Sequence, residues 1–174
     1  KENYLMAFEA ANDLSDGNEI KARVISTIAD IEIQQLNWQA ALDNYKILKE
    51  IDPFNIQVWK KVISLKLRLG LREDAQKELD ACLSIIVWEN EREKLRFISE
   101  CADDNQDFYY ARIKLADELQ EQGLQKNAIE ELDKVIKAGL EVRKKEIAIS
   151  ALQRIIKINP SNVKRYQDLL DELS

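Results

Sequence analysis

Apolar residues recur every three to four positions along most of this chain, which is the spacing that places them on one face of an α-helix. The clearest stretch is 20–55, where two such helices are separated by a short polar turn. Ile25 and Ile33 mark the apolar face of the first helix, and Ala41 begins that of the second. Pro53 closes the pair, because the residue before a proline is disfavoured in the α conformation. Neither helix can bury its apolar face alone, so the pair requires neighbours of the same kind.

The same periodicity, read together with the turn residues, predicts an all-α protein of about ten helices. Gly70, Gly123 and Gly139 are expected to end helices, and Asn90 with Glu93 to form a capping box at the start of one. The predicted helices span 3–14, 19–35, 38–51, 55–70, 72–88, 91–102, 108–122, 125–138, 142–158 and 162–173.

The helix pair at 20–55 has copies at an interval of 34 residues. Ala41 corresponds to Ala75 in the forward direction and to Ala7 in the backward direction. In each of the two later copies a large side chain follows the alanine after three residues, Tyr45 in one and Leu79 in the other. A fixed interval of this length is typical of repeat proteins, in which each unit buries its apolar face against the next.

The repeat resembles that of the tetratricopeptide repeat (TPR) family, whose pattern is W-x2-L-G-x2-Y, then A-x3-F, then P. Here these elements stand as Trp59-x2-Val62, Ala41-x3-Tyr45 and Pro53. The resemblance implies an α-solenoid of stacked antiparallel helix pairs that wind into a right-handed superhelix. Its concave surface would be lined by the first helix of each pair.

The whole chain is interpreted as one such array, with a partial repeat at 1–18, repeats at 19–54 and 55–89, divergent repeats at 90–123 and 124–160, and a terminal helix at 161–174. Two alignments compete after Trp88. One places Ala128-x3-Leu132 in the second helix of a repeat and implies a 19-residue insertion. The other, which we favour because first and second helices then alternate throughout, uses the alanines 7, 41, 75, 111 and 148. Because the chain does not begin with Met and opens inside a repeat, we expect it to be a piece of a longer protein.

Composition and charge exclude several classes of function. The formal net charge is −6, with acidic and basic residues interspersed, whereas nucleic acid and anionic membranes select a basic face. The sequence has no histidine, no phosphate loop, no nucleophile elbow and no metal-binding cysteine spacing. Cys82 and Cys101 are interpreted as core residues. We therefore predict no catalytic site, cofactor or metal, no nucleic-acid partner and no membrane insertion, with a cytoplasmic location as the default for a chain without a disulfide pattern.

The TPR resemblance implies a groove on the first helices, where the second, fifth, ninth and twelfth to thirteenth positions face a bound peptide. These positions hold Arg23, Ser26, Asp30 and Gln34 in the first complete repeat, Gln57, Lys60, Ser64 and Arg68 in the second, and Glu93, Arg96 and Glu100 in the third. The candidate partner-binding residues are Arg23, Asp30, Gln57, Lys60, Ser64, Arg68 and Arg96; the alternative is that they are simply solvated. Ser26 and Asp30 replace the lysine and asparagine with which chaperone-tail-binding repeats clamp a carboxylate, so we exclude that function.

Two further features bear on partners. Trp88 and the run Phe108-Tyr109-Tyr110 either pack the next repeat or are partly exposed for a partner. The terminal helix carries an apolar stripe, formed by Val163, Tyr166, Leu169, Leu170 and Leu173, which either docks on the preceding pair or forms a homo-oligomer. The sequence favours a non-catalytic interaction module, a scaffold or adaptor that presents its groove to a peptide or partner-protein segment. The alternatives are a self-associating structural module and an accessory region of a larger enzyme or regulator.

Overall fold

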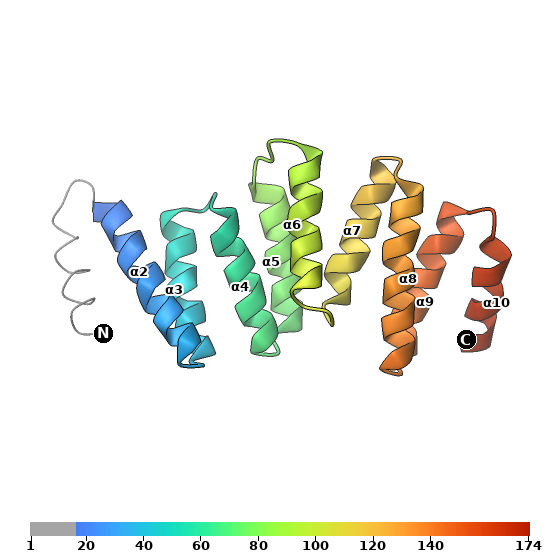
Figure 1. Cartoon of the computed structure of the whole chain (residues 1–174), viewed down its shortest axis with the longest axis horizontal. Coiled ribbons are helices and arrows are strands. Elements are labelled where there is room, and N and C mark those ends of the chain that lie inside the picture. The colour runs from blue at the N-terminus through green and yellow to red at the C-terminus, as the bar shows by residue number, and fades with distance from the viewer. Residues whose placement is uncertain (1–16) are drawn as a thin grey trace. The chain divides into compact units, whose positions relative to one another are not determined.

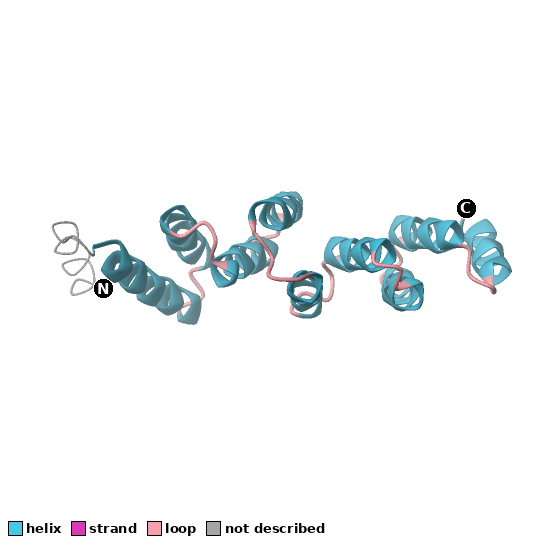
Figure 2. Ribbon diagram, turned by 90° about the horizontal axis from the view of Figure 1, so that it is seen from above, coloured by secondary structure: helices cyan, strands magenta, loops and turns pink. Residues whose placement is uncertain are grey.

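The computed structural model describes residues 17–174, and α-helices joined by short turns make up this part of the chain (Figure 1). The helix predicted at 3–14, with Ala7, lies outside the described residues. The chain divides into two compact units, Lys1–Val87 (unit 1) and Trp88–Ser174 (unit 2). Seen from above, successive helices within each unit alternate between two layers (Figure 2).

Unit 1 contains α2 (Gly17–Gln34), α3 (Trp38–Ile51), α4 (Ile56–Arg68) and α5 (Arg72–Ile85), each packed against the next along the chain. Its core is formed by the apolar faces that the periodicity predicts. Ala41 and Ala75 are fully buried, so these small side chains allow neighbouring helices to approach closely. The residues buried around α3 are Ile25, Ala29, Ala41, Leu42, Tyr45, Leu48, Val58, Val62 and Leu65.

Unit 2 contains α6 (Glu91–Asp103), α7 (Tyr109–Glu121), α8 (Gln125–Glu141), α9 (Lys145–Ile158) and α10 (Val163–Leu173), again packed in chain order. Cys101 is buried in α6, as Cys82 is in α5, which agrees with their interpretation as core residues. Ala111, Ala128 and Ala148 are all fully buried. Burial therefore does not separate the two alignments proposed for this half of the chain, and the repeat register after Trp88 stays a prediction.

Among the helices of residues 17–174, one type of turn ends four: α2, α4, α7 and α8. In each, a residue with positive φ follows the helix: Leu36 (62°), Gly70 (77°), Gly123 (76°) and Arg143 (57°). The next backbone N–H then donates to a carbonyl five residues earlier, for example from Leu124 to Leu119 at 2.9 Å. This is the Schellman motif, in which a left-handed residue allows the last helical carbonyls to be satisfied. The predicted helix ends at Gly70 and Gly123 are confirmed.

The prediction that Gly139 ends a helix is wrong, because α8 continues through it to Glu141. A β-carbon at Gly139 would lie 3.1 Å from the backbone nitrogen of Ala148. The glycine therefore serves close packing of α8 against the start of α9, and the left-handed turn falls at Arg143 instead. The residues from 142 to 144, predicted to be helical, form this turn.

The capping box at α6 forms with a shifted partner. Asn90 accepts a hydrogen bond from the backbone N–H of Glu93 at 2.9 Å, as predicted. The Glu93 carboxylate, however, accepts from the backbone N–H of Glu89 at 3.0 Å rather than from that of Asn90. The helix before it, α5, ends at Ile85, three residues earlier than predicted, because Ile86 adopts an extended conformation.

Candidate functional site

A cleft of about 460 Å³ opens in unit 1 between α2, α3 and α4. Its floor is apolar, formed by Ala22, Leu48 and Val58 together with the ring of Tyr45. Its rim is polar, formed by Glu19, Arg23, Ser26, Thr27, Asn55, Gln57 and Lys61. Apolar floors with a few polar groups at the edge are typical of sites that bind small molecules or peptide side chains.

The helices place the rim residues by simple spacing. Arg23 and Ser26 lie one turn apart on α2, and Gln57 and Lys61 lie one turn apart on α4, so each pair shares a helix face. Asn55 is the N-cap of α4, and its side chain accepts from the backbone N–H of Gln57 at 3.1 Å. The start of α4 is therefore fixed at the edge of the cleft.

The predicted groove residues are distributed between the cleft and its surroundings. Arg23 and Gln57 line the cleft, whereas the other candidates do not. Asp30 accepts a hydrogen bond from the Tyr45 hydroxyl at 2.9 Å, and Arg68 lies over the Trp38 ring with its Cζ 4.9 Å from the centroid. The remaining three are Lys60 and Ser64, which are half-buried on α4, and Arg96 of unit 2, which pairs with Glu100 at 2.8 Å.

Lys61 and Glu19 line the cleft but are not among the residues predicted from repeat position. Lys61 follows Gln57 at helical spacing, which is the signal that could have found it. With Arg23 and Lys61 against Glu19, cations outnumber anions at the rim. The cleft therefore carries a local charge opposite in sign to that of the chain as a whole.

Tyr45 links the cleft floor to α2. Its side chain is buried and its hydroxyl donates to Asp30. Burial, followed by the hydrogen bond and the charge of Asp30, raises the pKa of the Tyr45 hydroxyl well above its usual range. The hydroxyl stays protonated and acts as a fixed donor, so it orients the ring at the floor.

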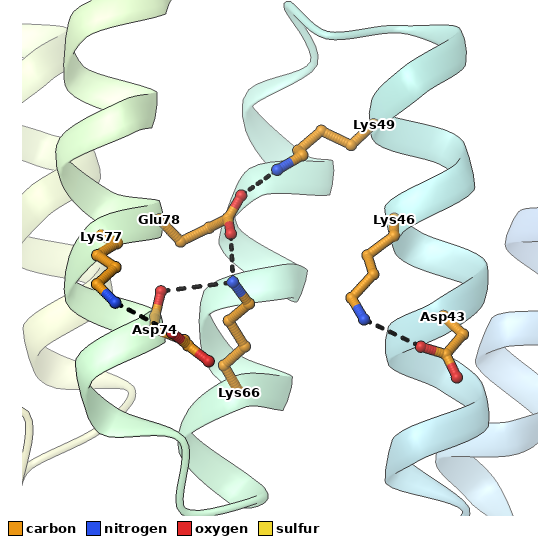
Figure 3. Close-up of polar contacts among 7 residues, drawn as sticks. All are labelled: Asp43, Lys46, Lys49, Lys66, Asp74, Lys77 and Glu78. Atoms are coloured by element: carbon orange, nitrogen blue, oxygen red, sulfur yellow. Dashed lines mark hydrogen bonds and ion pairs between the residues drawn. The ribbon is translucent and has the colours of Figure 1, made fainter.

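A charge cluster connects the three helices from α3 to α5 (Figure 3). The buried carboxylate of Glu78 on α5 accepts from Lys49 of α3 and, at 2.5 Å, from Lys66 of α4. Lys49 also lies over the Trp59 ring, with its Nζ 4.3 Å from the centroid. Burial favours the protonated acid, but the hydrogen bonds and charges of the two lysines outweigh it and lower the pKa of Glu78. The cluster thus holds α3, α4 and α5 together.

Unit 2 has ion pairs of the same kind. Arg112 of α7 bridges Asp103 of α6 and Glu131 of α8, both at 2.9 Å. The sequence left open whether Trp88 and the run Phe108-Tyr109-Tyr110 pack inside the protein or are partly exposed. Phe108 is buried, and the half-buried Trp88 lies with its ring centroid 5.3 Å from that of Phe97.

In the part of the chain that the structure describes, no group of three or more carboxylate or cysteine side chains is arranged to hold a metal ion. Among residues 17–174, no helix is both long and apolar enough to cross a membrane.

No protein-family model matches the chain, and no curated protein matches it in sequence. Solved structures do resemble it. A crystal structure of MamA protein is 18% identical, covers 87% of this chain and 85% of its own, and has a TM-score of 0.40. The structure of YrrB, described as a TPR protein with an unusual peptide-binding site, is 16% identical over 93% of this chain and 100% of its own, with a TM-score of 0.39. A TPR protein from Parabacteroides merdae is 14% identical over 99% of both chains, with a TM-score of 0.35.

The likeness to TPR proteins rests on the chain's own geometry: antiparallel helix pairs, an interval of 34 residues between Ala41 and Ala75, and complete burial of both alanines. The chain has a TPR-like fold. The right-handed superhelix that this fold implies remains an expectation.

Proposed function

We propose that this chain is a non-catalytic protein–protein interaction module, a scaffold or adaptor whose unit 1 cleft receives an extended segment of a partner protein. The observation that carries the proposal is the cleft itself, with an apolar floor and a polar rim formed by three successive helices. The TPR-like fold adds support, although a fold alone does not determine function.

The chemistry of the cleft suits a peptide with one apolar and one acidic side chain. Leu48 and Val58 would bury the apolar side chain, while the side-chain amide of Gln57 would hydrogen-bond the extended main chain. Arg23 and Lys61 would attract the carboxylate, in agreement with the excess of cations at the rim.

The test is selection of peptides from a random display library on the immobilised chain, followed by affinity measurement by fluorescence anisotropy. We expect the double variant Arg23→Glu/Lys61→Glu to weaken binding by about tenfold or more, a loss that should shrink as salt is raised. The matched control is Lys46→Glu/Lys77→Glu, which changes the charge equally at two exposed lysines outside the cleft. Circular dichroism would confirm that both variants are folded.

Two results would contradict the proposal. One is an equal loss of affinity in the cleft variant and the control. The other is a selected peptide that leaves the methyl NMR signals of Ala22, Leu48 and Val58 unchanged, because a peptide on the floor must shift them.

The terminal helix favours a second candidate function, self-association. Tyr166 of α10 is buried against the preceding helices, but the rest of the apolar stripe, Val163, Leu169, Leu170 and Leu173, is only half-buried. Light scattering across a concentration series would test this. A dimer that dissociates when Leu169 and Leu170 are changed to serine, but not when the exposed Asp168 is changed to asparagine, supports it. A monomer at every concentration rules it out.

A further inference from the structure

A second cleft, of about 610 Å³, lies in unit 2 between α7 and α9. It is lined by Asp117 and Gln120 of α7 and by Gln153, Arg154 and Lys157 of α9. These two helices lie in the same layer of the unit, with α8 in the other layer (Figure 2). None of the five residues was predicted from repeat position, so this cleft is a site separate from that of the proposed function.

The guanidinium of Arg154 is held in a defined position inside this cleft. Its Nε donates to the Asp117 carboxylate at 3.2 Å, and its Nη1 donates to the Ser150 hydroxyl at 3.0 Å. Within the described residues, the second terminal nitrogen, Nη2, has no protein acceptor. An arginine fixed along one edge and open along another is pre-organised to bind an anion, because little side-chain entropy remains to be lost.

The other groups around the cleft complete a set of unused donors. In the part of the chain that the structure covers, Lys157 makes no ion pair, and the side-chain amides of Gln120 and Gln153 make no hydrogen bond. All three are exposed. An amide both donates and accepts, which is what the main chain of an extended peptide requires. The ammonium group of Lys157 supplies a second positive charge beside that of Arg154. The residues that line the cleft thus carry two positive charges and one negative charge, that of Asp117.

The adjoining surface limits where an anion can lie. A smaller hollow shares Asp117 and Gln120 with the cleft and adds Lys114, Glu118 and Glu121. Glu118 is paired with Lys94 at 2.5 Å, but Asp117 and Glu121 still outnumber Lys114 in this hollow, so negative charge is favoured more at the Arg154–Lys157 end. A ligand that runs along the cleft should therefore be acidic at one end and neutral at the other.

From this arrangement we propose that the α7–α9 cleft binds an extended acidic segment of a protein partner, with its carboxylates on Arg154 and Lys157 and its main chain on Gln120 and Gln153. The volume suits a few peptide residues, and the separation of charge along the cleft sets the direction of the segment. The site acts independently of the unit 1 cleft, so either one can bind without the other.

The probe is a blocked six-residue peptide with two glutamates followed by four neutral residues, titrated into the full chain at low salt. Its reference replaces both glutamates with glutamine. We expect the acidic peptide to shift the side-chain NMR signals of Arg154 Nε–H and of Gln120 and Gln153, and to bind about three- to tenfold more tightly than the reference. The variant Lys157→Glu should abolish this preference. The control Lys137→Glu, an exposed lysine of α8 away from the cleft, should keep it.

Several outcomes would overturn the proposal. Equal binding of the two peptides would do so, as would equal effects of Lys157→Glu and Lys137→Glu. Shifts caused by inorganic phosphate at matched ionic strength, without shifts from the peptide, would replace the peptide site with a simple anion site. Because Lys157 could also support the end of α9, Gln153→Ala is tested as well, and it should weaken both peptides equally while the helical circular dichroism is unchanged. The unit 1 variant Arg23→Glu/Lys61→Glu should leave this titration as it is in the wild type, so failure of one site is distinguishable from failure of the other.

Discussion

A left-handed turn lies at each end of α8. Replacing the glycine of the first turn with alanine and the arginine of the second turn with glycine should change the stability of unit 2 in opposite directions. Gly123 precedes α8 with φ of 76°, and Arg143 follows it with φ of 57°. A β-carbon at Gly123 would meet no atom within 4 Å, so replacing it with alanine changes only the backbone energy. The two sites thus isolate the energy of one backbone conformation in one unit of the protein.

The magnitude follows from two terms. An L-residue in the left-handed region is destabilised by about 1–2 kcal/mol, and alanine recovers about 0.4–1 kcal/mol by restricting the unfolded chain. Gly123→Ala should therefore destabilise unit 2 by about 1 kcal/mol. Arg143→Gly should stabilise it by about 1 kcal/mol, since Arg143 is exposed and its side chain makes no polar contact within the described residues.

Native-state hydrogen exchange of the α8 amides is the suitable assay, because helical arrays unfold in parts and exchange reports the stability of α8 separately from that of the other helices. A change of 1 kcal/mol alters the exchange rate about fivefold. Gly123→Asn is the control, since asparagine tolerates the left-handed region better than alanine and should recover part of the loss. If asparagine is as destabilising as alanine, or if Arg143→Gly speeds exchange in α8, the turn conformation does not set the stability.

Three further predictions concern packing and charge. Gly139→Ala should destabilise unit 2 by roughly 1–3 kcal/mol in urea denaturation, because its β-carbon would press on the backbone of α9; an unchanged midpoint would show that the helices can separate without loss. Glu78→Gln should destabilise unit 1 by about 2 kcal/mol at pH 7, because two lysines lose their charged acceptor. The folded-state pKa of Glu78 is lowered, so its contribution is present above the ordinary value of 4.5 and is lost as pH falls through the folded pKa. Urea midpoints of wild type and variant should converge in that range, and a constant gap would refute the charge mechanism. Tyr166→Phe removes the hydrogen bond to Asp133 at 3.2 Å and should speed exchange of the α10 amides about fivefold, while the α7 amides keep their rates.

The helices were predictable because their signals are local. The helical spacing of apolar residues, together with Pro53, predicts α3 with the bounds that the structure shows, Trp38–Ile51. Glycine was the exception, since Gly123 and Gly139 look alike in sequence. Gly123 is required by a left-handed turn, whereas Gly139 is required by the close contact with Ala148. Only the role of Gly139 depends on a neighbouring helix. Leu36 and Arg143 also adopt the left-handed conformation, but neither residue type favours it, so the sequence does not predict these two turns.

The site was predictable in part. Repeat position selects Arg23 and Gln57, and both line the unit 1 cleft, because position along a helix sets the face on which a side chain lies; their role in partner binding stays a prediction. Lys61 and the α7–α9 cleft depend on how neighbouring helices are rotated against each other, which side-chain packing decides. The Glu78 cluster draws its members from three helices, so no sequence spacing indicates it.

Because α8 has the same tight turn at both ends, it is joined to α7 and to α9 by connections of only a few residues. Closing so short a loop removes little chain entropy, and the contacts that α8 makes with both neighbours are local in sequence. Such contacts form faster than those between distant segments. The three helices from α7 to α9 are thus the stretch of unit 2 that can fold first at the smallest entropic cost, with α6 and α10 adding to its two sides.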